Sequence, residues 1–208
     1  SPRAEGAWDP WGQPYQYRCP GEVHPWGFDV WSWRGDSRRA ARWIGNWTSP
    51  LDLAREAPAG AIVIEGESMQ PVESSGGIDT RPQQAEAVVN APFSSGAQLL
   101  INMAEEGQWV ELAPPTPVPA GEYDAYLFYG MSWDYGVFQW SIGANQDAGL
   151  TDGYSERLGM GSVGPLRATV GAESVTLRVQ VIRSNDRSAG RKAGIDALVL
   201  APVWEGRR

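Results

Sequence analysis

The sequence predicts a mainly β fold, in which a jelly-roll β-sandwich is preceded by a small β-hairpin segment with a short helix. Residues 174–183, SVTLRVQVIR, alternate apolar and polar side chains with the two-residue period of a strand that has one buried face. The 25 glycines and 16 prolines supply turns between such segments. Seven of the 11 tryptophans lie before residue 60, while the net charge of −8 arises after it, so we expect two units.

The first unit is expected over residues 1–48, with a linker over 49–60 and the sandwich over 61–204. In the first unit, PYQYR and FDVWSW are β-prone, and the Pro- and Gly-containing stretch CPGEVHPWG separates them. This pattern predicts a hairpin with a long loop. The linker has room for one helical turn.

Four ordered pieces of this unit carry a family resemblance: DPWGQPYQY, PGEVH, GFDVWS and IGNW. Over residues 9–47 they resemble the C-terminal half of the type II secretion major pseudopilin. The resemblance implies a bacterial origin and pilin-type proteins as partners. The long hydrophobic N-terminal helix of that family is missing from this sequence.

In that family an acidic loop before IGNW holds calcium, but this sequence reads RGDSRRAARWIGNW there. Only Asp36 could supply a carboxylate, and guanidinium groups cannot ligate a cation that requires oxygen. We therefore expect no calcium in this loop. A short helix capped by Asp36 or Ser37 is expected instead.

Strands dominate from residue 61 onward. Eight segments have strand character and are separated by turn-rich stretches. One is residues 174–183, described above. The other seven are AIVIEGE, AQLLIN, GQWVEL, GEYDAYLFY, YGVFQWSIG, LRATV and GIDALVLA. Eight strands in one unit predict a sandwich or jelly roll that is large enough to form a stable core. The lone Cys19 cannot form an internal disulfide.

The order of five pieces resembles the calcium-binding carbohydrate-binding modules of families 6 and 35; they are IEGESM, SSGAQLL, VPAGEYDAYLFY, DYGVFQWSIG and GIDALVL. The resemblance covers residues 61–203. It implies a non-catalytic, glycan-binding protein that works outside the cytoplasm, in the periplasm, at the cell surface or after secretion.

Sugar recognition requires an aromatic face and polar groups for the hydroxyls. The candidates are Trp133, Asp134 and Tyr135 in MSWDYG, with Asn185 and Arg187 in RSNDRSAGR. The resemblance implies that the loop before the final strand lines the sugar site, which makes Asn185 the strongest candidate. Trp133 could alternatively be a packed corner residue.

Two further tryptophans, Trp109 and Trp140, fall inside predicted strands and are expected in the core.

A structural Ca²⁺ site is expected from Glu65, Glu67 and Asp196. Glu65 and Glu67 are one residue apart, so they leave the same face of a strand. In the resembled modules the first and last strands are neighbours, which would add Asp196 and give calcium several oxygen ligands. The alternative is that both glutamates are solvated and that Asp196 caps a turn.

Several functions are excluded by the residues present. His24 is the only histidine and lies in the hairpin, so the sandwich lacks a histidine base for nucleophilic catalysis. A carboxylate pair among Asp134, Asp147, Asp152 and Glu156 leaves a glycan-active enzyme as a distant alternative. We expect no enzyme.

An acidic sandwich disfavours nucleic acid, and no apolar run approaches the length of a membrane span. GMGSVG, residues 159–164, matches a dinucleotide pattern but precedes a proline and a strand, so it is interpreted as a loop. The second candidate function is a structural or assembly subunit of a pilus or secretion-type apparatus, whose sandwich binds protein.

Overall fold

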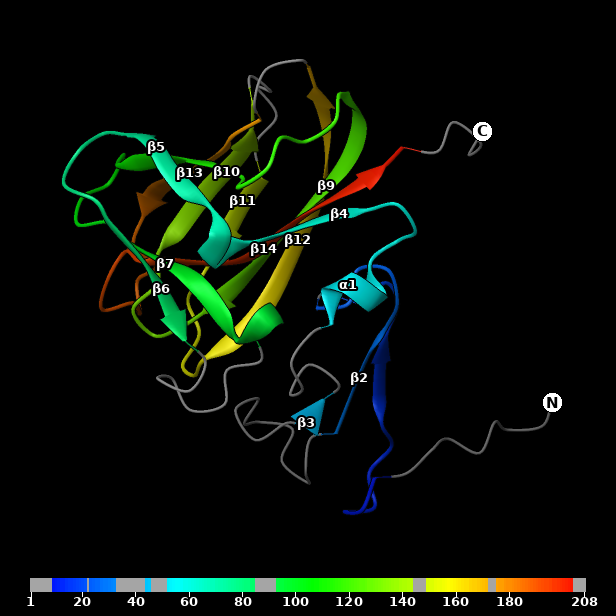
Figure 1. Ribbon diagram of the computed structural model, residues 1–208. Coiled ribbons are helices and arrows are strands. Elements are labelled where there is room, and N and C mark those ends of the chain that lie inside the picture. The colour runs from blue at the N-terminus through cyan, green and yellow to red at the C-terminus, as the bar shows by residue number, and fades with distance from the viewer. Residues whose placement is uncertain are drawn as a thin grey trace.

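The computed structural model describes residues 9–21, 23–32, 44–45, 52–84, 93–143, 149–171 and 175–203. It forms a mainly β structure in which two sheets pack face to face and a smaller unit lies beside them (Figure 1). The predicted fold class is confirmed. Among the described residues, no helix is both long and apolar enough to cross a membrane.

One layer is an antiparallel five-stranded sheet. Its strands in spatial order are β11 (Gly149–Asp152), β10 (Val137–Ile142), β13 (Leu177–Arg183), β8 (Trp109–Ala113) and β5 (Gln70–Ser74). The two-residue alternation of β13 appears as expected, because Leu177 and Val179 are buried while Arg178 and Gln180 point outward.

The other layer is a six-stranded sheet. Its strands in spatial order are β12 (Gly159–Val170), β9 (Gly121–Met131), β14 (Ala193–Pro202), β7 (Ala97–Asn102) and β6 (Asp79–Gln84), with β4 (Ile62–Glu65) also paired to β14. β4 pairs with Ala197–Leu200 of β14 and β7 with Ala193–Ile195. The first strand of the sandwich therefore lies against the last, as expected.

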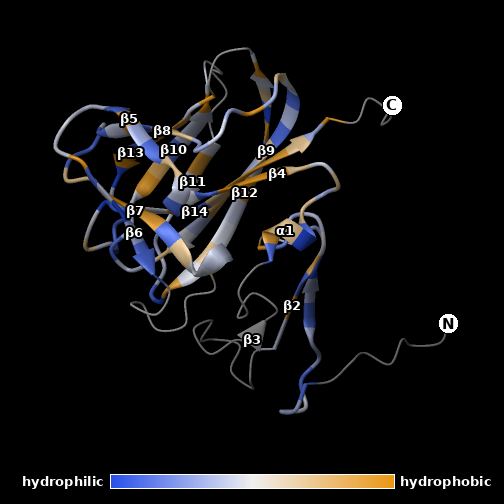
Figure 2. Ribbon diagram, in the orientation of Figure 1, coloured by the Kyte–Doolittle hydropathy of each residue, from blue (hydrophilic) through white to orange (hydrophobic). Residues whose placement is uncertain are grey.

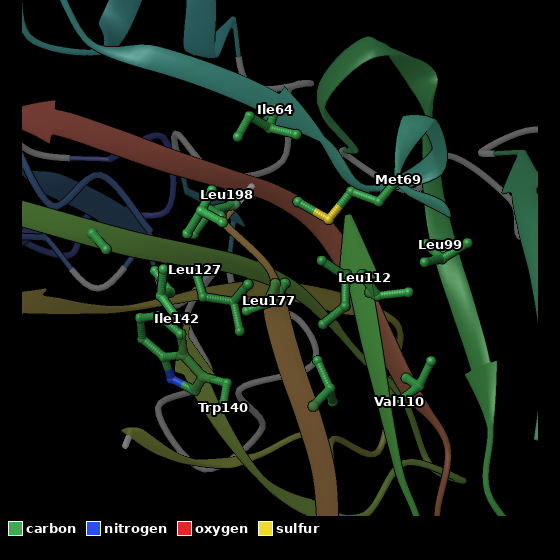
Figure 3. Close-up of a cluster of buried hydrophobic side chains, with 14 of the residues drawn as sticks. Ile64, Met69, Leu99, Val110, Leu112, Leu127, Trp140, Ile142, Leu177 and Leu198 are labelled. Carbon is green, nitrogen blue, oxygen red and sulfur yellow. The ribbon is translucent and has the colours of Figure 1, made fainter. Parts of the chain in front are cut away.

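The core lies between the two sheets (Figure 3). Trp140, Leu112 and Leu127 are fully buried there, together with aliphatic side chains from both layers. Burying a large apolar side chain contributes about 1.5–3 kcal/mol, so the core between the two sheets is the main source of stability. Trp140 is in the core as expected.

Trp109 was expected in the core, and this prediction was wrong. It is half-buried on the outer face of β8, where the guanidinium carbon of Arg178 lies 3.7 Å from the ring centre. Trp109 does lie in a strand, as predicted, but its side chain points to the outer face of the sheet, because successive side chains alternate between the two faces.

The N-terminal unit forms the predicted hairpin. β1 (Gln16–Arg18) and β2 (Asp29–Ser32) pair antiparallel, and β3 (Ile44–Gly45) adds to β2. The predicted helical turn in the linker is α1 (Leu53–Glu56), where the Asp52 carboxylate accepts from the Arg55 N–H at 3.2 Å. Apart from β3, the loop in which we expected a short helix and no calcium lies outside the described residues.

The hairpin and α1 cover the outer face of the six-stranded sheet. The Trp26 ring lies 5.0 Å from that of Tyr126 and 5.6 Å from that of Phe128, measured between ring centres. Val23 and Leu53 are buried in the same cluster, beside Ala197 and Val199 of β14. β14 is consequently buried on both faces.

Three strands and part of a fourth escaped the sequence analysis. β5, β6 and β11 were not predicted, and the GMGSVG stretch interpreted as a loop is the first half of β12. In Figure 2, β6 is blue and β4 is orange, so the missed strand lacks the apolar pattern that identified the other. Pro82 within β6 also removes an N–H, which an edge strand tolerates.

Candidate functional site

Three loops meet at one end of the sandwich. Residues 132–136 connect β9 to β10, residues 153–158 connect β11 to β12, and residues 184–192 connect β13 to β14. Isolated bridges join Ser132 to Tyr154 and Tyr135 to Lys192. The first loop therefore lies between the other two, and all three present side chains on one surface.

Trp133 is the most exposed aromatic side chain of this surface. It is 58% exposed, while its carbonyl oxygen accepts from the Ala189 N–H at 3.1 Å. The backbone is thus fixed while the indole remains open, so Trp133 is no packed corner residue. Its flat face is available for stacking.

Asn185 lies on the neighbouring loop and is already oriented. Its amide nitrogen donates to the Asp152 carboxylate at 2.6 Å, and its amide oxygen accepts from the Arg187 N–H at 2.9 Å. Arg187 is exposed. The structure therefore brings Asn185 of the 184–192 loop together with Asp152, the last residue of β11, and sequence reasoning did not assign Asp152 to this site.

Asp134 is held by a charge pair. The Lys192 ammonium donates to the Asp134 carboxylate at 2.6 Å, and the Asp134 side chain is only 14% exposed. The Lys192 N–H donates in addition to the carbonyl of Asp134 at 3.2 Å. Asp134 thus links the two loops, and Lys192 is a member of the site that the sequence did not reveal.

Tyr135 lies below the surface, at 3% exposure. Its phenolic oxygen accepts from the side-chain amide of Gln98 at 2.7 Å, and Gln98 also donates to Gln83 at 2.7 Å. Burial raises the pKa of Tyr135, the Gln98 hydrogen bond opposes the rise, and the Asp134 charge adds to it. Tyr135 therefore anchors the loop that presents Trp133.

Glycines make room for this anchor. A Cβ at Gly194 would lie 2.1 Å from the amide oxygen of Gln98, and one at Gly130 would lie 2.3 Å from it. Both distances are too short for real contacts, so the present position of the buried amide depends on glycine in β9 and in β14. Gln98 was another residue that the sequence analysis missed.

The predicted metal residues lie elsewhere, along β4 and β14. Asp196 is fully buried at a β-bulge of β14, and β-bulges re-aim side chains. Glu65 ends β4, whereas Glu67 lies in the 3₁₀ turn Gly66–Ser68. The expectation that both glutamates leave one strand face was wrong, because the strand ends between them.

Two serines connect the three carboxylates. The Ser94 N–H donates to Asp196 at 2.9 Å, and the Ser94 hydroxyl donates to Glu65 at 3.0 Å. The Ser95 hydroxyl donates to Glu67. The backbone is closely packed here, since a Cβ at Gly66 would lie 2.0 Å from the carbonyl oxygen of Ile195.

The electrostatics of this cluster are unfavourable without a cation. Burial raises the pKa of Asp196 well above its usual range, and the nearby charges of Glu65 and Glu67 add to the rise. Burial likewise raises the pKa of Glu65. The alternative that Asp196 caps a turn agrees with its hydrogen bond, since Ser94 is the first residue of the 3₁₀ turn Ser94–Gly96.

One oxygen on each carboxylate is buried without a hydrogen-bond partner: Glu65 Oε2, Glu67 Oε2 and Asp196 Oδ2. A buried anionic oxygen of this kind is costly unless a donor or cation compensates it. The three side chains nonetheless do not form a ready-made set of metal ligands in the described part of the chain. Glutamate side chains can adjust their rotamers around an ion, so the three unpartnered oxygens make this cluster a candidate cation site.

No protein-family model and no curated protein matches the chain. Among solved structures, the chain resembles a xanthan lyase of Paenibacillus with 21% identity and a TM-score of 0.51, over 68% of this chain. The chain spans 13% of the lyase's length. This likeness shows the β-sandwich fold alone.

Two complete modules give lower scores. A CBM36-1 domain of a multidomain xylanase, from the hindgut metagenome of Trinervitermes trinervoides, has 18% identity and a TM-score of 0.44, covering 70% of this chain and 99% of the domain. The low-affinity xylan-binding module CBM86 of Roseburia intestinalis has 11% identity and a TM-score of 0.42, covering 67% and 93%.

Proposed function

We propose that this protein is a non-catalytic glycan-binding module that works outside the cytoplasm. The observation that carries the proposal is the exposed Trp133 indole beside the oriented Asn185–Asp152 pair. An aromatic face stacks on the apolar side of a pyranose, and amide and carboxylate groups bind its hydroxyls. Arg187 adds an exposed donor group.

Two of the loops, 132–136 and 184–192, carry the binding residues in this proposal. Trp133 supplies the stacking platform, and Asn185 with Arg187 supplies hydrogen bonds. Asp134 and Tyr135 hold the loop through Lys192 and Gln98. The sequence resemblance to carbohydrate-binding families 6 and 35 and the sandwich fold both support this assignment.

A non-catalytic role fits the chemistry of the surface. The Asp134 carboxylate is paired with Lys192, and the Asp152 carboxylate accepts from Asn185. A retaining or inverting glycosidase needs two carboxylates facing one glycosidic bond, one of them protonated. Both carboxylates here are engaged as hydrogen-bond acceptors, which favours a structural role.

Calcium has a structural role in this proposal. Glu65, Glu67 and Asp196 would hold the ion with their unpartnered oxygens, since Ca²⁺ prefers carboxylate and carbonyl oxygen. Bound calcium supplies positive charge that compensates the buried carboxylates. The ion would thereby tie β4 to β14 and keep Ser94 in place.

A glycan array followed by calorimetry tests the function. We expect weak binding of a polysaccharide or oligosaccharide that Trp133→Ala reduces by at least about tenfold. The matched control is Trp11→Ala, since Trp11 is also exposed, at 46%, but lies in the N-terminal unit. Equal binding by Trp133→Ala and the parent protein would place the site elsewhere.

A second candidate is an assembly subunit whose partners are pilin-type proteins. It is favoured by the exposed aromatic side chains of the N-terminal unit, Trp11, Tyr15, Tyr17 and Phe28. Large apolar surface left open often marks a protein interface. The pseudopilin relation itself rests on the sequence resemblance of residues 9–47. The absence of any glycan ligand in the array would favour this candidate.

A further inference from the structure

A cavity of about 370 Å³ lies where the hairpin, α1 and the six-stranded sheet meet. It is outside the loop surface that carries Trp133. Its volume falls within the range of small-molecule sites, about 300–1,000 Å³. The cavity therefore needs an explanation of its own.

The walls are mainly aromatic and aliphatic, with two polar groups. Trp26, Phe28, Phe128 and Leu53 line the cavity, as do His24 and Glu56. An apolar lining with few polar groups is typical of a site that takes a ligand with an apolar body and one polar end.

His24 is fixed by the hairpin. Its Nδ1 lies 2.9 Å from Asp29 Oδ1, which also accepts from the His24 N–H at 3.2 Å, while Asp29 Oδ2 accepts from the Val23 N–H at 3.1 Å. Gly21 allows this arrangement, because a Cβ there would lie 2.5 Å from Asp29. With Nδ1–H donating to Asp29, a neutral imidazole has its acceptor lone pair on Nε2.

That Nε2 atom faces a second acceptor. It lies 3.8 Å from Glu56 Oε2, which is too long for a hydrogen bond. A nitrogen placed about 2.9 Å from each atom would bridge them. An ammonium has several donor hydrogens and can serve both acceptors at once, whereas a hydroxyl has one.

Charge and aromatic lining favour the same ligand. Glu56 and the buried Asp29 make the polar end of the cavity acidic, which disfavours anions. Aromatic faces such as those of Trp26 and Phe28 attract cations through their quadrupole. We infer that this cavity binds a primary ammonium group that carries an aliphatic chain, between His24 and Glu56.

The test compares n-pentylammonium with its neutral analogue 1-pentanol at pH 8. Binding is followed by NMR on the whole chain, with the Trp26 indole N–H signal as a local reporter. We expect pentylammonium to bind at least about tenfold more tightly than pentanol. Glu56→Gln should reduce pentylammonium binding to the level of pentanol and leave pentanol unchanged.

Glu106→Gln is the matched control, because Glu106 is exposed and pairs with Arg191 in another part of the fold. Similar affinities for the two probes would overturn the inference, as would an equal effect of the two Gln variants. N-acetyl-lysine amide then separates the sources of the ammonium. Binding at least as tight as that of pentylammonium indicates a lysine side chain of a protein, and binding tenfold weaker indicates a free amine.

Discussion

The side-chain amide of Gln98, fully buried in β7, donates a 2.7 Å hydrogen bond to the phenolic oxygen of Tyr135. This bond connects the interior of the six-stranded sheet to the loop between β9 and β10. Tyr135 is two residues beyond Trp133, so the bond restrains the segment that presents the exposed indole. The binding surface is thus anchored to a β-strand.

Replacing Tyr135 with Phe should reveal this anchor. The change removes the acceptor for Gln98 and nothing else of the ring, so we expect a loss of about 1 kcal/mol in unfolding free energy. For a chain of this size, that corresponds to a melting temperature lower by about 2–4 °C. The exposed Tyr15→Phe is the control and should leave the midpoint unchanged. No shift in Tyr135→Phe would show that the bond does not stabilise the loop.

Asn185→Ala and Asp152→Ala separate direct contact from orientation. If Asn185 binds sugar hydroxyls, Asn185→Ala should weaken binding by about 1–3 kcal/mol, through unpaired polar groups. Asp152→Ala removes the group that orients Asn185 and that also accepts from the Tyr154 N–H at 3.0 Å, and it should have a smaller effect on binding. Calorimetry with the same oligosaccharide gives both values. A larger loss in Asp152→Ala would assign the sugar contact to Asp152 instead.

Asp196→Asn should change stability in opposite directions with and without calcium. In chelator the variant should unfold at a higher temperature than the parent protein, because a buried carboxylate that has one unpartnered oxygen and two neighbouring carboxylates has been removed. Calcium at about 100 times its dissociation constant should stabilise the parent by about 2.7 kcal/mol and the variant much less. Thermal unfolding measures both effects. If calcium leaves the parent midpoint unchanged, the metal site does not exist.

The pH dependence in chelator follows from the raised pKa values of Asp196 and Glu65. Above about pH 4 the unfolded chain loses these protons, while the folded chain retains them. The folded state then binds more protons, so the unfolding free energy contributed by these groups falls as the pH rises through the folded pKa values.

Urea unfolding of the parent and Asp196→Asn, from pH 4 to 8, isolates the contribution of Asp196. The parent should lose stability relative to the variant as the pH rises, and added calcium should remove the difference in slope. A parent that gains stability relative to the variant over this range would contradict the raised pKa of Asp196.

The sequence predicted those parts of the fold in which side-chain pattern follows burial. β7 and β9 were found because their residues are apolar or alternate clearly. β5 is exposed at every position, and its residues follow no core pattern. Such a strand is specified by its pairing with β8 across a long sequence separation, which no local pattern records.

The candidate site was predictable only in part, for a similar reason. Asp134 and Asn185 carry recognisable chemistry, but Asp134 is held by Lys192 of another loop and Asn185 is oriented by Asp152 at the end of β11. Gln98 left one faint signal, a polar residue within an apolar strand. The space for the Gln98 side chain depends on glycines in β9 and β14, which come close to Gln98 only in the folded chain.

The cover that the hairpin and α1 provide over the six-stranded sheet has a practical consequence for producing the sandwich alone. A fragment that starts at residue 61 would lack Val23, Trp26 and Leu53, and would leave Phe128 and Val199 open to water. An uncovered apolar sheet face invites self-association. The shortest piece of this chain that keeps this sheet face covered therefore includes the hairpin and α1, although the strands that follow residue 61 complete the sandwich by themselves.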